Sequence, residues 1–137
     1  MGRSIGAVAL GFLYALAGIG LTQFVLWFCI PGEPQDDDAE SVPPARLVLT
    51  VACTFASSAL GGFMAAHFAG RAQTNHGLAL GTILVAVLAL TAGLVQADYP
   101  PWYRLALPAT ALPGALLGAY LRGRLRRPPA PAPPKAT

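Results

Sequence analysis

Long apolar stretches alternate with short polar ones along this chain, and the pattern predicts four membrane-spanning helices. Apolar side chains dominate residues from about 5–30, 45–69, 78–96 and 102–121. A helix needs about 20 predominantly apolar residues to cross the roughly 30 Å of hydrocarbon in a bilayer. All four stretches are close to that length or exceed it, and their central parts contain no ionisable side chain. We therefore expect an all-α fold, an integral membrane bundle of four transmembrane helices with short loops.

The polar stretches between the predicted helices contain residues that end helices. Residues 31–44 combine prolines with an acidic run, residues 70–77 form a polar turn, and residues 98–101 form a tighter one. Proline removes a backbone donor and glycine carries an entropic cost in a helix, so both favour turns. The predicted organisation is a single transmembrane domain over residues 1–121. Residues 122–137 are a basic tail rich in Pro and Ala, which we expect to be disordered because it has nothing to bury.

Composition excludes the common alternatives to a membrane protein. The chain has 137 residues, of which 55% are hydrophobic and 11% are charged, whereas a soluble domain carries about 25% charged residues. The apolar content excludes charged disorder, and two cysteines are too few for a small disulfide-stabilised domain. The first apolar run is about twice as long as the 7–15 residues of a signal-peptide core, so we expect it to be retained.

The distribution of Lys and Arg predicts which way round the protein sits. With the N-terminus inside, the inner side carries Arg3, Arg71, Arg122, Arg124, Arg126, Arg127 and Lys135, and the outer side carries only Arg46 and Arg104. All six acidic residues fall outside. Short cytoplasmic loops are enriched in Lys and Arg, so both termini are expected to be cytoplasmic. The aromatic side chains near residues 99–103 are expected to lie at the outer interface as anchors.

Contacts between the helices are expected at small residues spaced four apart. Lipid tails are as apolar as Leu, so helices associate where small side chains let backbones approach closely. The second predicted helix carries two adjacent stripes of such residues, which favours a place at the centre of the bundle. We assign helix packing to Gly11, Ala15, Ser57, Ser58, Gly61, Gly62, Ala65, Ala66, Gly77, Gly81, Gly114 and Gly118. Tyr14 and Gln23 are larger polar groups at membrane depth and are also expected to face protein.

Chemistry inside the bilayer is expected to be absent. Catalysis or ion coupling there ordinarily needs an ionisable residue at depth, and the predicted spans have none. His67 and His76 flank the inner turn, but no Cys, Asp or Glu lies on that side to complete a metal site. We therefore expect no catalytic residue, no metal, no other cofactor and no enzyme activity.

Basic and histidine side chains at the inner surface are candidates for contact with lipid headgroups or a partner. These residues are His67, Arg71, His76, Arg122, Arg124, Arg126 and Arg127. Each cation beside anionic lipid contributes about 1 kcal/mol, so the net charge of +3 indicates a membrane surface, and no nucleic acid partner is expected. For the arginine cluster, the preferred interpretation is a topology anchor, and specific contact with lipid or a partner is the alternative.

Two segments of the sequence resemble a known group of proteins. The first is GGFMAAHFAGR at residues 61–71, followed by His76-Gly77. The second is PWYR at residues 101–104, followed by Pro113-Gly114 and a basic end. Together they are similar to a pattern in a family of small, uncharacterised four-helix bacterial inner-membrane proteins. The resemblance implies the bacterial cytoplasmic membrane as the location, and it implies no activity.

The leading functional hypothesis is a structural or accessory protein that packs with itself or with a larger membrane complex. The alternative is a minimal transporter or channel for a small solute, which would have to oligomerise to enclose a pathway. A transporter should gather Tyr14, Gln23 and the helix hydroxyls on one cavity, whereas an accessory protein should scatter them. A membrane enzyme that depends on His67 and His76 is the third possibility. Membrane lipids are the expected partners in every case.

Overall fold

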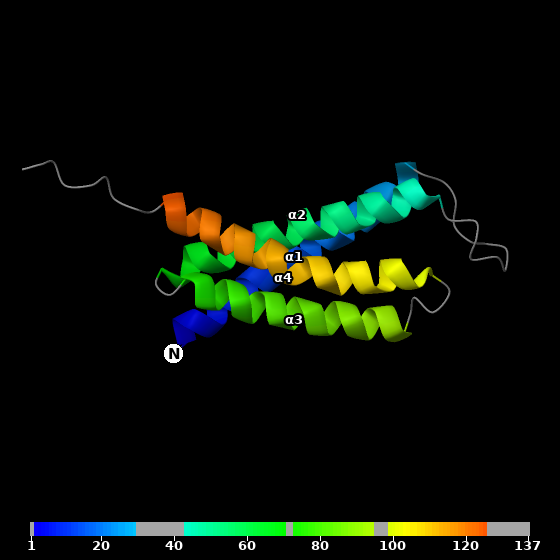
Figure 1. The fold of residues 1–137 in the computed structure, drawn as a ribbon. Helices are drawn as coiled ribbons and strands as arrows, with labels where there is room; N and C mark the ends of the chain where they lie inside the picture. Colours follow the sequence, from blue (N-terminus) through cyan, green and yellow to red (C-terminus); the bar gives the residue numbers. More distant parts are fainter. Residues whose placement is uncertain (1, 30–42, 71–72, 95–98, 126–137) are drawn as a thin grey trace, which may run out of the picture.

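The computed structural model describes residues 2–29, 43–70, 73–94 and 99–125. These residues form four α-helices and no strand: α1 (Gly2–Cys29), α2 (Pro44–Ala69), α3 (Gln73–Leu94) and α4 (Pro101–Leu125). The helices run alternately up and down along one axis, so α1 begins at the end of the bundle where α4 finishes (Figure 1). α1, α2 and α3 each contain a stretch long and apolar enough to cross a membrane. The predictions of an all-α fold and of three helices long and apolar enough to cross a membrane are confirmed, whereas the fourth crossing stays a prediction.

Three helix ends differ from the sequence prediction by three residues or more, and the first is the start of α1 at Gly2 instead of residue 5. α3 begins at Gln73 instead of residue 78, so His76 lies in its first turn and not in a loop. α4 continues to Leu125 instead of ending at residue 121, and it includes Arg122 and Arg124. Apolar length identifies the part of a helix that can sit in hydrocarbon, whereas Gln and Arg are good helix formers in water. The predicted outer loop and basic tail lie mostly outside the described residues, in 30–42 and 126–137.

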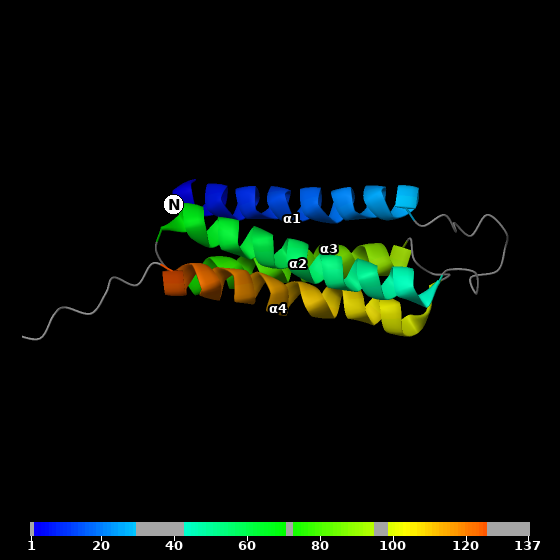
Figure 2. The ribbon, with the colours of Figure 1, turned by 90° about the horizontal axis from the view of Figure 1, so that it is seen from above.

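α2 is the helix on which the others assemble. It packs against all three other helices, whereas the backbones of α1 and α4 do not come close to each other within the described ranges. Figure 2 shows α2 lying between α1 and α4. Successive positions on a helix are 100° apart, so two adjacent stripes of small residues serve two partners on different sides.

One stripe of α2, formed by Ser57, Gly61 and Ala65, faces α1. A Cβ atom added to Gly61 would lie 2.7 Å from the carbonyl oxygen of Gly11, and one added to Gly11 would lie 2.7 Å from that of Gly61. A Cβ on Gly18 would lie 2.7 Å from the Ser57 hydroxyl. The two backbones therefore touch where these glycines meet, and neither glycine has room for a methyl group.

The neighbouring stripe of α2 faces α4. Gly62 lies against the backbone of Ala115, and Gly118 lies against the carbonyl group of Ala59. A Cβ added to Gly114 would lie 2.7 Å from the carbonyl oxygen of Phe55. These approaches bring α2 and α4 into backbone contact over two helical turns, which maximises van der Waals packing inside a bilayer.

α3 joins the bundle mainly through α4. Gly81 packs on Leu112, whose Cδ1 would lie 2.6 Å from an added Cβ, and Gly77 packs on Ala119. Leu80 and Leu84 are fully buried beside Ala111 and the other small residues of the core. α1 is thus held by α2, and α3 is held mainly by α4.

We predict that Gly118→Val destabilises the folded bundle by about 1–3 kcal/mol, because the new side chain would overlap the backbone of α2. The measurement is the free energy of unfolding in mixed detergent micelles. Gly20→Val is the control, because an added Cβ there meets nothing within 4 Å. Equal stability of the two variants would contradict the observed α2–α4 contact.

Candidate functional site

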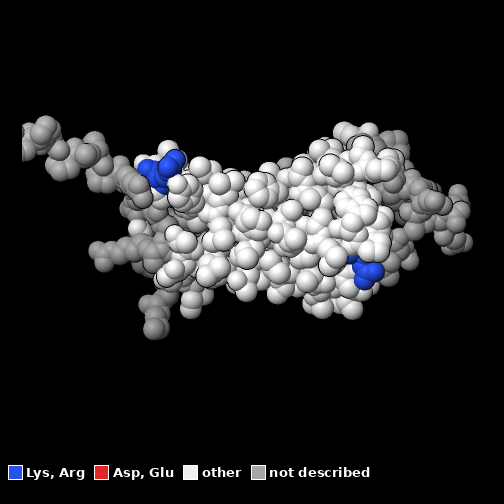
Figure 3. Space-filling view, viewed as in Figure 1, with Lys and Arg blue, Asp and Glu red and all other residues white. Residues whose placement is uncertain are grey.

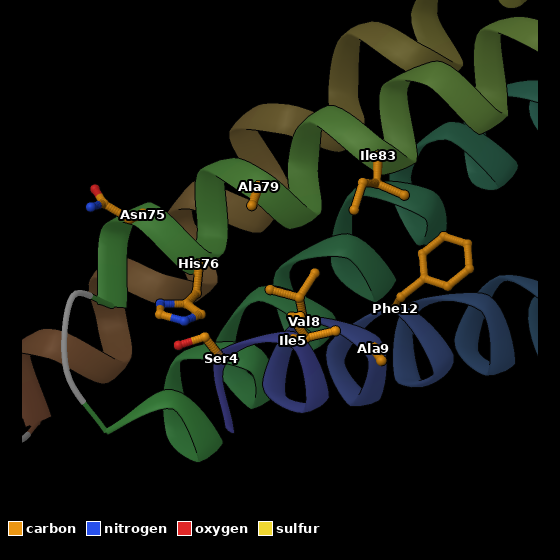
Figure 4. Close-up of a pocket in the computed structure, with 9 residues that line it drawn as sticks. All are labelled: Ser4, Ile5, Val8, Ala9, Phe12, Asn75, His76, Ala79 and Ile83. Atoms are coloured by element: carbon orange, nitrogen blue, oxygen red, sulfur yellow. The ribbon is translucent and has the colours of Figure 1, made fainter. Parts of the chain in front are cut away.

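A groove of about 590 Å³ opens between α1 and α3, and we call it the α1–α3 groove. It is lined by Ser4, Ile5, Val8, Ala9 and Phe12 of α1 and by Asn75, His76, Ala79 and Ile83 of α3 (Figure 4). α1 and α3 make the least contact of the helix pairs that touch. The groove follows from this arrangement, because each of its walls is held mainly by a different helix.

Polar atoms gather at one end of the α1–α3 groove. His76 projects from α3 toward Ser4 on α1, whereas Asn75 points away from α1 (Figure 4). Both His76 and Ser4 belong to the first turn of their helices. Deeper in the groove the walls are apolar, with Val8, Phe12 and Ile83 facing the space. The groove therefore has a polar end at the bundle surface and an apolar floor.

Three other residues assigned to headgroup or partner contact, His67, Arg122 and Arg124, lie around the same end of the bundle but outside the groove. His67 is exposed and packs edge-on against Phe68, with ring centroids 5.2 Å apart. The Arg122 guanidinium lies 5.8 Å from the ring centroid of Phe63 on α2. Arg124 lies over Tyr120 at 5.3 Å. The three remaining assigned residues, Arg71, Arg126 and Arg127, lie outside the described residues.

Charge on the visible face of the bundle is confined to its two ends. Figure 3 shows arginine or lysine at each end and an uncharged surface between them. All six acidic residues of the chain fall in the undescribed ranges. Within the described ranges, no three His, Cys, Asp or Glu residues come together as a metal site.

The hydroxyl groups of the helices are mostly engaged by their own backbones. Thr22 donates to the carbonyl oxygen of Gly18 at 2.8 Å, and Thr54 donates to that of Thr50 at 2.8 Å. The same bond to the preceding turn is made by Thr50, Thr82, Thr91 and Thr110. These threonines do not line the α1–α3 groove. They satisfy their polar atoms locally, and two of them, Thr50 and Thr54, are buried on the packed face of α2.

The prediction that both larger polar groups face protein is wrong for Tyr14, which is 42% exposed. Gln23 is also an exposed residue, but its side chain hydrogen-bonds to Tyr103 on α4. Neither residue lines the α1–α3 groove. Tyr14 points away from the core because its position on α1 lies outside the narrow stripe of Gly11 and Ala15 that packs on α2.

Tyr103 was expected to be an interfacial anchor, but it is buried, with 4% of its surface exposed. Its ring packs on Leu47 and Leu107, and its hydroxyl hydrogen-bonds to Thr50 and Gln23. Thr50 also donates to the backbone carbonyl oxygen of Arg46. This chain of hydrogen bonds links α1, α4 and α2 near the end of the bundle opposite the groove's polar end.

A signal for the burial of Tyr103 was present in the sequence. Tyr103, Leu107 and Ala111 repeat at intervals of four and lead into Gly114 and Gly118. Residues at that spacing lie on one face of a helix. All five residues are buried in α4. If the face defined by Gly114 and Gly118 is followed back to the start of the helix, it predicts that Tyr103 is packed against protein.

A second opening, of about 340 Å³, lies between α3 and α4. Its lining includes Ala92, Gly93 and Pro108, and Arg104 is the one ionisable residue among the described residues that line it. This opening is smaller than the α1–α3 groove, and none of the threonines described above lines it.

Comparisons with known proteins leave the fold and the grooves as the basis for inference. No protein-family model, no curated protein and no solved structure matches this chain. The resemblance to small bacterial inner-membrane proteins stays a prediction.

We predict that Tyr103→Phe lowers the free energy of unfolding by about 0.6–1.7 kcal/mol, because it removes hydrogen bonds between helices. Tyr120→Phe is the matched control, since Tyr120 is exposed, and its effect should be close to zero. Combining Tyr103→Phe with Gln23→Leu should cost less than the sum of the single changes. Additive costs would show that Gln23 and Tyr103 are not coupled.

Proposed function

We propose that this protein is a multi-pass protein of the bacterial cytoplasmic membrane with a structural or accessory role. It packs with itself or with a larger membrane complex and is not an enzyme. The observation that carries this proposal is that Tyr14, Gln23 and the threonines described above do not line the α1–α3 groove. Threonine hydroxyls are engaged by their own helices, and Tyr14 and Gln23 lie outside the α1–α3 groove. A solute pathway within one copy would need such groups on one shared surface.

The exposed surface of α1 supports a role in association. Large apolar side chains, among them Leu13, Leu21 and Phe24, are at least 60% exposed. Only a narrow stripe of α1 packs on α2. The remaining surface is available to lipid, to a second copy or to another membrane protein.

We further propose that α4 is the fourth membrane crossing and that both termini are cytoplasmic. Arg104 and Arg122 are 18 positions apart in α4, which corresponds to about 27 Å of helix and is close to the hydrocarbon thickness. α4 buries one face against α2 and α3, so it needs fewer strongly apolar side chains than a helix surrounded by lipid. The excess of inner Lys and Arg supports the orientation.

Reporter fusions test this topology. A fluorescent protein that folds only in the cytoplasm should be active at both ends of the chain, and alkaline phosphatase should be active only when fused within residues 31–42 or 95–98. The expected pattern follows from four crossings and the positive-inside rule. An external C-terminus would mean that α4 does not cross and would overturn the proposed topology.

Purification and transport measurements test the proposed role. In mild detergent the protein should co-purify with a stoichiometric membrane partner or as a defined homo-oligomer. Proteoliposomes should show no solute-selective flux above protein-free vesicles. Saturable flux that is lost in a Tyr14→Phe, Gln23→Leu double variant would instead establish the minimal oligomeric transporter. A protein that purifies only as a monomer without partners would contradict the accessory role.

A further inference from the structure

We propose that the α1–α3 groove holds one acyl chain of an anionic glycerophospholipid, with the lipid phosphate at the end marked by His76 and Ser4. This inference rests on the membrane location proposed above and does not depend on the accessory role. It assigns a defined lipid site to one surface of the bundle, as distinct from the general contact with lipid that every membrane helix makes.

The dimensions of the groove match one leaflet of a bilayer. Its lining runs from Ser4 to Phe12 on α1 and from Asn75 to Ile83 on α3. Eight residues of helix extend about 12 Å, and half of the hydrocarbon core is about 15 Å thick. The volume of about 590 Å³ lies within the range of about 300–1,000 Å³ that is usual for small-molecule sites. A single lipid tail fits this length and this volume.

The groove has a polar end and an apolar floor, as a phospholipid has a polar headgroup and an apolar tail. Ser4 and His76 supply hydrogen-bonding groups at the surface end, and Val8, Phe12 and Ile83 supply an apolar floor (Figure 4). The same end of the bundle carries the last turn of α4 with Arg122 and Arg124 (Figure 1). No acidic residue is found among the described residues there. The positive charge at this end of the bundle favours an anionic headgroup over a zwitterionic one.

A protein helix fits the same groove less well. A transmembrane partner would contact the bundle along about 30 Å, more than twice the length of the groove lining. Helix-packing surfaces need small residues in a stripe, whereas Ile5, Phe12 and Ile83 form much of this wall.

Native mass spectrometry of the full chain tests the lipid site. The protein is reconstituted in vesicles of equal parts palmitoyl-oleoyl phosphatidylglycerol and phosphatidylethanolamine, extracted in mild detergent, and weighed intact. The wild-type protein should retain one phosphatidylglycerol. Ala9→Trp and Ala79→Trp should each lower that retention by about tenfold, because an indole at either position fills the groove. His76→Gln should keep a bound lipid but lose the preference for phosphatidylglycerol.

Ala17→Trp is the matched control, because Ala17 is an exposed alanine of α1 that does not line the groove. It should retain lipid like the wild type, and circular dichroism should show the same helix content in every variant. Equal lipid retention in the groove variants and in Ala17→Trp would overturn the proposal. So would a dimer that replaces the lipid-bound form and is lost in Ala79→Trp, since a second copy would then occupy the groove. Topology and flux results are independent readouts, so failure of the accessory role leaves this test intact.

Discussion

Backbone contact between helices is the constraint on which the rest of this structure depends. Inside a bilayer the hydrophobic effect does not favour helix association, so stability comes from close packing. α2 meets this requirement twice, through Gly61 against Gly11 and through Gly62 against Ala115. The two contacts occupy adjacent positions on α2 and therefore point in directions about 100° apart. This angle places α1 and α4 on different sides of α2 and keeps their backbones apart within the described residues.

The remaining features of the bundle follow from that arrangement. α3 packs mainly on α4 through Gly77 and Gly81, so α1 and α3 are neighbours that no stripe of small residues draws together. The α1–α3 groove is the space left between them. The burial of α4 also accounts for its composition, because a helix that lies against protein on one face can include Pro108 and Pro113 and fewer strongly apolar residues.

Polar chemistry is separated along the bundle axis. Threonine hydroxyls within the helices donate hydrogen bonds to backbone carbonyl groups of their own helix. Tyr103, by contrast, links three helices at one end of the bundle. At the other end lie His76, Arg122 and Arg124. This arrangement leaves the middle of the bundle to packing and places the charged side chains of the described residues at its two ends. The proposed lipid site and the proposed accessory role both use this division.

The sequence by itself determined the helices, because a run of apolar residues long enough for hydrocarbon is a local property of the chain. It also indicated the two stripes on α2, since spacing along one helix defines its faces. Tertiary structure decided which stripe meets which helix, because that depends on how neighbouring helices are rotated. The same cause buried Tyr103, left Tyr14 exposed and brought His76 beside Ser4. The groove could not be predicted, because it is an absence of packing between two helices that are held by others.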